Sequence, residues 1–248
     1  MPPRIFSPYE INHLRKHGYV DIDPMTIGEK PVEYLTGHAD FCGLDFLVNS
    51  STLIPRIESE KIVQLTIDLI NQKGLNHPVI ADVGTGSGCL GLSIAYKLNK
   101  QQTPYTIYLS DISPEALQIT RENTDHLLTS PANIFFQKSY LLADYPHIKF
   151  DIIVAKLPYI PSKNLAALPP SVKEFEPVLA LDGGSGGVIL INRLLRNLPY
   201  FLSPQGYAIL EFDDTHTLKD FVIPSELKAK TEDDLYGIPR FLIISVKS

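Results

Sequence analysis

A glycine-rich turn between a short apolar run and a helical segment constrains the fold of this chain more than any other feature. Residues 79–81 are predicted to form a buried strand, residues 82–88 (Asp-Val-Gly-Thr-Gly-Ser-Gly) follow directly, and residues 89–98 have helical spacing. Glycines let the backbone turn tightly against a ligand, and a helix that begins there directs its N–H groups at that ligand. The pattern predicts a ligand site at the carboxyl end of a strand in an α/β fold.

Strand and helix patterns alternate along most of the chain. We expect further strands at 107–109, 134–136, 150–154, 207–212 and 241–246, helices at 8–17, about 58–74, 114–128 and 188–201, and a hairpin at 41–48. This alternation implies a mostly parallel sheet covered by helices on both faces. With 248 residues, of which 44% are hydrophobic, the chain suits one α/β domain with a small appendage. We predict a short N-terminal extension over 1–54 and a catalytic domain over 55–248.

Composition disfavours several other classes of protein. The formal net charge of −6 gives no basic footprint for nucleic acid, and no stretch approaches the ~18 apolar residues of a membrane span. Cys42 and Cys89 lie outside any metal-binding or disulfide pattern, and the histidines, including His38 and His216, are expected at the surface or in loops without forming a ligand pair. Since the start also lacks an apolar signal segment, we expect a soluble, cytoplasmic monomer that binds no metal, nucleic acid or membrane.

Two aspartates decide which ligand the turn favours. Residues 86–91 also satisfy the dinucleotide fingerprint GxGxxG, which keeps a nicotinamide-dependent oxidoreductase as an alternative. Asp82 opposes it, because a carboxylate there repels a pyrophosphate but suits S-adenosylmethionine, which carries an ammonium and a sulfonium cation. Asp111 ends the next strand, where a carboxylate can accept both ribose hydroxyls, although a helix-capping role would also explain it. The predicted S-adenosylmethionine-binding residues are Asp82, Gly84, Thr85, Gly86, Gly88 and Asp111, with Ser139 and Tyr140 expected near the adenine.

Three separated motifs point to one family. Residues 55–60 (Pro-Arg-Ile-Glu-Ser-Glu), 150–161 (ending Lys-Leu-Pro-Tyr-Ile-Pro) and 176–184 (Glu-Pro-Val-Leu-Ala-Leu-Asp-Gly-Gly) occur in the order found in the HemK-like glutamine methyltransferases, which modify peptide chain release factors. The chain resembles that family from about Pro31 to its C-terminus. The resemblance implies a Rossmann-like class I methyltransferase fold with a seven-stranded, mostly parallel sheet. It also implies methyl transfer to the amide nitrogen of the glutamine in the release factor's Gly-Gly-Gln loop, with Lys156, Pro158 and Tyr159 at the amide position.

The chain departs from the family pattern at the loop that follows the strand at 150–154. The family has Asn-Pro-Pro-Tyr there, and its Asn accepts hydrogen bonds from the substrate amide; Lys156 and Leu157 replace the first two residues. A protonated lysine has donors and no acceptor, so Lys156 either points away, is neutral, or impairs the site. The helical region ahead of the predicted catalytic domain is also shorter than the one that members of this family usually have. Alternative functions are therefore a catalytically impaired binding protein of this fold, a methyltransferase with another amine or amide substrate and, as a minor possibility, a DNA adenine methyltransferase.

Overall fold

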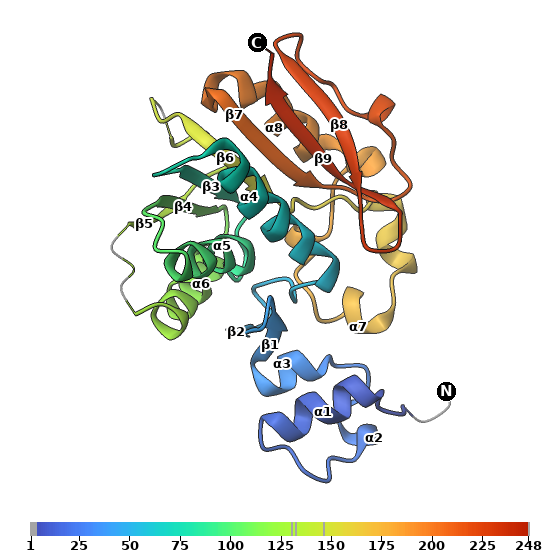
Figure 1. Ribbon diagram of the computed structural model, residues 1–248. Helices are drawn as coiled ribbons and strands as arrows, with labels where there is room; N and C mark the ends of the chain where they lie inside the picture. The colour runs from blue at the N-terminus through green and yellow to red at the C-terminus, as the bar shows by residue number, and fades with distance from the viewer. Residues whose placement is uncertain (1–3, 130, 132, 146, 248) are drawn as a thin grey trace.

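A seven-stranded sheet forms the centre of the computed structural model, which describes residues 4–129, 131, 133–145 and 147–247. The strands lie in the order β5-β4-β3-β6-β7-β9-β8, and Figure 1 shows them as one twisted layer. Neighbouring strands are parallel up to β7, whereas β9 is antiparallel to both β7 and β8. The bounds are β3 Val79–Val83, β4 Thr106–Asp111, β5 Ile134–Lys138, β6 Phe150–Ala155, β7 Leu202–Glu211, β8 Leu227–Asp233 and β9 Pro239–Val246.

Helices cover both faces of this sheet. Alternate strand residues point to opposite faces, so Ile80 and Ile152 join one core cluster and Ala81 and Ile153 the other. The first cluster includes residues of α4 (Glu60–Lys73) and α5 (Cys89–Lys100), and the second includes those of α8 (Ile189–Phe201); α6 (Pro114–Leu127) contacts β4 and β5. This arrangement confirms the predicted Rossmann-like class I methyltransferase architecture.

The N-terminal segment packs below the sheet layer in Figure 1. It contains α1 (Pro8–Lys16), α2 (Pro24–Ile27), α3 (Val32–Thr36) and the antiparallel hairpin of β1 (His38–Phe41) and β2 (Leu44–Leu47). Ser7 and Glu10 form the capping box that begins α1. The hairpin is fixed to α6 because the Leu47 N–H donates to Asn123 Oδ1 at 2.6 Å, while Asn123 Nδ2 donates back to the Leu47 carbonyl at 2.9 Å. Phe41 and Phe46 also join the main core, and the division at residue 54 stays a prediction.

Strand β8 was not among the strands expected from individual sequence patterns. Its residues alternate Leu227, Ala229 and Thr231 with lysine and glutamate on the other side. Such charged residues are typical of sheet edges, where they discourage pairing with other chains, and they hide the strand signal. The remaining elements are α7 (Pro170–Lys173) and the short 3-10 turns η1 Ile57–Ser59, η2 Ser162–Ala167, η3 Val178–Ala180, η4 Ser185–Gly187 and η5 Leu218–Asp220. Among the described residues, no helix is both long and apolar enough to cross a membrane.

Candidate functional site

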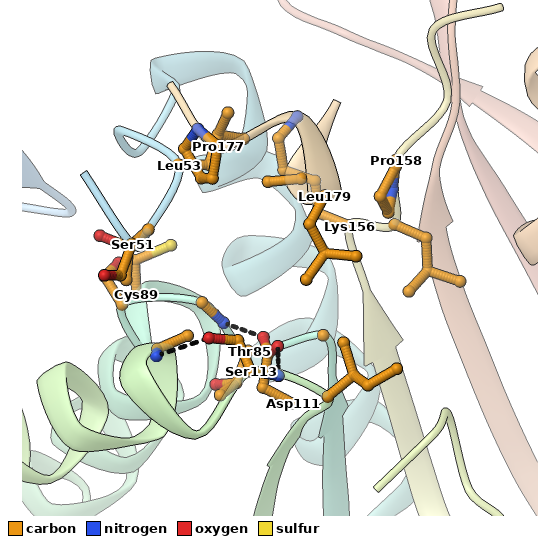
Figure 2. A pocket seen from close by; sticks show the side chains of 18 of the residues that line it. Ser51, Leu53, Thr85, Cys89, Asp111, Ser113, Lys156, Pro158, Pro177 and Leu179 are labelled. Atoms are coloured by element: carbon orange, nitrogen blue, oxygen red, sulfur yellow. Dashed lines mark hydrogen bonds between the residues drawn. The ribbon is translucent and has the colours of Figure 1, made fainter. Parts of the chain in front are cut away.

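A pocket of about 420 Å³ lies at the carboxyl ends of the central parallel strands. Strand ends at this edge deliver side chains from β3, β4, β5 and β6 into one volume, which is where open α/β sheets bind ligands. Figure 2 shows Asp111 and Thr85 on one side of the pocket and Lys156 and Pro158 on the other. Of the predicted site residues, those that line the pocket are Gly84, Thr85, Gly86, Asp111, Ser139, Tyr140, Lys156 and Pro158.

Asp111 organises the glycine-rich turn. Its Oδ2 accepts the Gly86 N–H at 2.9 Å, and its Oδ1 accepts the Ser113 N–H at 2.9 Å. A carboxylate oxygen can accept a second hydrogen bond, so each oxygen retains acceptor capacity toward the pocket. Burial is the largest influence on this carboxyl group and raises its pKa, against the lowering effect of the backbone N–H donors. Asp111 therefore has the position and free lone pairs that recognition of a diol requires.

Asp82 and Gly88 lie outside the pocket lining. The Asp82 side chain is fully buried behind the turn, where its Oδ2 accepts the Thr85 hydroxyl at 2.7 Å and the Gly91 N–H at 2.9 Å. Gly88 is the N-cap residue of α5. Asp82 thus positions the turn and the start of α5. A direct cofactor contact by either residue stays a prediction.

Burial raises the pKa of Asp82 to about 6, which predicts a pH-dependent contribution to stability. The folded-state pKa lies above the unfolded value of about 3.9, so this contribution is complete below pH ~4 and is lost as pH rises through ~6. The shift corresponds to about 3 kcal/mol. We expect the free energy of unfolding of the native chain to fall by about that amount relative to Asp82→Asn between pH 4 and 7, measured by denaturant titration. Parallel pH profiles for the two proteins would contradict a raised Asp82 pKa.

The ammonium group of Lys156 is paired with the buried carboxylate of Glu211. It forms a salt bridge with Glu211 and hydrogen-bonds the Tyr159 hydroxyl at 3.1 Å, and Glu211 is 1% exposed. Burial alone would lower the pKa of Lys156, but the Glu211 carboxylate and the Tyr159 hydroxyl outweigh it, so the pKa is raised. The second oxygen of Glu211 accepts the Ser59 hydroxyl at 2.6 Å. The neutral form considered for Lys156 is therefore disfavoured, and its positive charge is balanced inside the protein.

The sheet register explains this pairing. Strands β6 and β7 are parallel neighbours in which Ala155 is opposite Leu210, so Lys156, the first residue after β6, lies beside Glu211, the last residue of β7. No role for Glu211 was predicted from the sequence, because the pairing depends on strand order. Tyr159, expected at the amide position, is not among the residues that line the pocket, and its hydroxyl donates to Glu211 Oε1 at 3.1 Å.

Two loops meet over the pocket through a second buried acid. Arg56 forms a salt bridge with Glu176, whose side chain is 1% exposed, and both loops contribute residues to the pocket wall. The structure thus brings together the motifs at 55–60 and 176–184. The neighbouring Ser51–Leu53 segment also lines the pocket (Figure 2), and no sequence signal had indicated it.

The glycine turns at 183–187 are tightly constrained by the neighbouring backbone. A Cβ on Gly183 would lie 2.8 Å from the Pro158 carbonyl oxygen, and one on Gly187 would lie 2.2 Å from the Tyr159 carbonyl oxygen. Gly187 also has a φ of +77°, which L side chains rarely adopt. These glycines therefore allow the backbone to pack directly against the loop at 156–159.

The expectation for the histidines was wrong in one region. His13 is buried, and His17 and His38 stack with ring centroids 4.4 Å apart beside Asp45. These residues are separated in the sequence and meet only when α1 packs on the hairpin. Both cysteines are free thiols, Cys42 and Cys89.

The fold and the pocket define a methyltransferase domain, and comparison with known proteins supports this. A family model described as "Methyltransferase domain" matches residues 76–234. Solved structures share the fold: a methyltransferase from Pyrococcus furiosus has a TM-score of 0.56 at 17% identity, covering 84% of this chain and 90% of that one. A putative methyltransferase, YhhF, from Escherichia coli has a TM-score of 0.54 at 13% identity, covering 83% and 93%.

Curated relatives identify the family more narrowly. The release factor glutamine methyltransferase of Koribacter versatilis is 35% identical over 221 residues, which cover 86% of this chain and 74% of that protein. Its counterpart in Bradyrhizobium diazoefficiens is 32% identical over 246 residues, covering 96% and 78%, and that of Moorella thermoacetica is 38% identical over 192 residues, covering 77% and 65%. The chain belongs to the release factor glutamine methyltransferase family.

Proposed function

We propose that this chain transfers a methyl group from S-adenosylmethionine to the side-chain amide nitrogen of a glutamine in the Gly-Gly-Gln loop of a peptide chain release factor. The observation that carries the proposal is a pocket lined both by Asp111, whose carboxylate keeps acceptor capacity for a diol, and by residues 156–158, in a chain of this family. Relatives at 30–38% identity bear the name of that activity.

The cofactor end of the pocket fits S-adenosylmethionine. Asp111 would accept hydrogen bonds from the ribose hydroxyls through its remaining lone pairs, and the backbone at Gly84 and Gly86 would approach the cofactor closely. Ser139 and Tyr140, which line the same pocket, would contact the adenine, and the Arg193 guanidinium lies over the Tyr140 ring at 5.2 Å to its centroid. When bound, the cofactor supplies a methyl group already activated by a sulfonium, so the protein needs to provide orientation and charge balance rather than a strong base.

Glu211 makes Lys156 compatible with a bound cation. An unpaired ammonium ~4 Å from a sulfonium would cost about 4 kcal/mol at an effective dielectric of ~20. The Glu211 carboxylate offsets this repulsion, because the pair carries no net charge. Two of the three ammonium donors go to Glu211 and Tyr159, and the third has no partner among the described residues. We assign that N–H to the carbonyl oxygen of the substrate amide, which would orient its nitrogen toward the methyl group.

A second candidate function rests on the same residue. The Lys156–Glu211 pair occupies the position where the resemblance places an amide-accepting Asn, and a lysine in this salt bridge accepts nothing from the substrate NH₂. The second candidate is therefore a protein that binds the cofactor and a partner without transferring the methyl group. A single measurement distinguishes the two functions.

That measurement is mass spectrometry of a purified release factor after incubation with S-adenosylmethionine and either the native chain or Lys156→Asn. We expect the native chain to add one methyl group to the Gly-Gly-Gln glutamine. Methylation by Lys156→Asn alone would instead support the binding protein, with a scaffold silenced at one residue. Absence of methylation with both proteins, although each binds S-adenosylmethionine, would overturn the release factor assignment.

A further inference from the structure

Three side chains from separate elements of the N-terminal segment converge away from the pocket. His17 follows the end of α1, His38 begins β1, and Asp45 lies in β2. Each residue offers one possible ligand atom, and these three atoms lie within 4.8 Å of one another. Among the described residues, this is the group of side chains that could hold a metal ion. We propose that His17, His38 and Asp45 bind a divalent zinc ion that fastens α1 to the hairpin.

The chemistry of the three groups suits zinc. Two imidazole nitrogens and one carboxylate oxygen are common zinc ligands. His17 Nε2 and Asp45 Oδ1 are buried, lie 3.9 Å apart and have no hydrogen-bond partner among the described residues, which is costly unless a ligand satisfies them.

The geometry needs only small side-chain movements to coordinate an ion. Ligands about 2.0–2.1 Å from a tetrahedral zinc lie about 3.3–3.5 Å apart. His38 Nδ1 and Asp45 Oδ2, now hydrogen-bonded at 2.9 Å, would separate by a few tenths of an ångström, and His17 Nε2, 3.9 Å from Asp45 Oδ1, would move slightly closer. His126 of α6 lies outside this three-residue group, although its Nε2 is 4.0 Å from Asp45 Oδ2.

A metal here would connect the N-terminal segment to the catalytic fold. The hairpin that carries His38 and Asp45 is already bonded to α6 through Asn123, and only two residues separate α6 from the strand that ends in Asp111. The α1 helix, by contrast, contacts mainly α3 within the same segment. Zinc would add a direct link from α1 to the hairpin and, through the hairpin, to α6. This role is independent of methyl transfer.

The test is zinc binding by the full chain after removal of metal with a chelator. We expect one zinc per chain by elemental analysis after dialysis, and a rise in the melting temperature of about 5–10 °C when free zinc reaches ~100 times its Kd. His17→Ala and Asp45→Asn should each weaken zinc binding about 100-fold or more by direct titration. Asp45→Asn keeps the side-chain shape, so it separates a lost ligand from a misfolded segment.

The matched control is His77→Ala, which removes an exposed histidine that hydrogen-bonds Thr106 far from the cluster. It should retain native zinc stoichiometry and the same zinc-dependent melting shift. A native chain that retains no zinc would overturn the proposal. So would zinc binding that His17→Ala and Asp45→Asn leave unchanged. Neither result would bear on methyl transfer, because the assay contains no cofactor or release factor.

Discussion

Replacing Glu211 with alanine is expected to lower the free energy of unfolding by about 3–5 kcal/mol, which is a fall in melting temperature of about 6–20 °C. The variant would leave the Lys156 ammonium charged, with its side chain only 11% exposed and without its carboxylate partner. It would also remove the acceptor for the Ser59 hydroxyl. Denaturant unfolding of the cofactor-free protein measures the effect. Glu226→Ala, at an exposed glutamate, should change stability by less than about 0.5 kcal/mol.

A double-mutant cycle measures the interaction energy between Lys156 and Glu211. Lys156→Met alone leaves Glu211 as a buried, unpaired acid, whereas Lys156→Met combined with Glu211→Ala removes both charges. We expect the double variant to be more stable than the sum of the single effects predicts, by a coupling energy of about 1–3 kcal/mol. Additive losses would show that the two charges do not interact in solution.

Local patterns were sufficient to identify several residues that line one end of the pocket. A strand, a glycine turn and a helix are consecutive in the chain, so Gly84, Gly86 and the strand-ending Asp111 could be placed before the fold was known. The strands of the sheet were also predictable from their sequence patterns, except β8. The charged residues on one side of β8 hide its strand pattern. The seven-stranded sheet came from the family resemblance and not from individual strand signals.

The side chains that pair with Lys156 or form the histidine cluster come from segments that are distant in the sequence. Glu211 lies 55 residues from Lys156, and only the parallel register of β6 and β7 brings them together. The cluster of His17, His38 and Asp45 likewise forms by packing α1 on the hairpin. Neither pairing has a short sequence motif. Charge compensation at a substituted position is therefore visible only once strand order is known, and this is why Lys156 seemed incompatible with the site by itself.

Asp111→Asn is expected to weaken S-adenosylmethionine binding about 100-fold or more. Two charge-assisted hydrogen bonds to ribose hydroxyls contribute about 1.5–3 kcal/mol each, and the amide lacks the charge and one acceptor. Its NH₂ group would also face either the Gly86 or the Ser113 N–H, both of which now donate to the carboxylate, and would displace the turn. Isothermal titration with the cofactor measures the change.

The matched control is Asp125→Asn, which neutralises an exposed carboxylate on α6 without touching the pocket and should bind the cofactor normally. Because burial raises the pKa of Asp111, protonation at falling pH should also weaken binding to the native protein, as an O–H replaces an acceptor lone pair. Asp111→Asn should lose this component of the pH dependence. Cofactor binding by Asp111→Asn equal to that of Asp125→Asn, with both variants folded, would show that Asp111 only caps the turn, and the ligand would then have to be held by the remainder of the pocket wall.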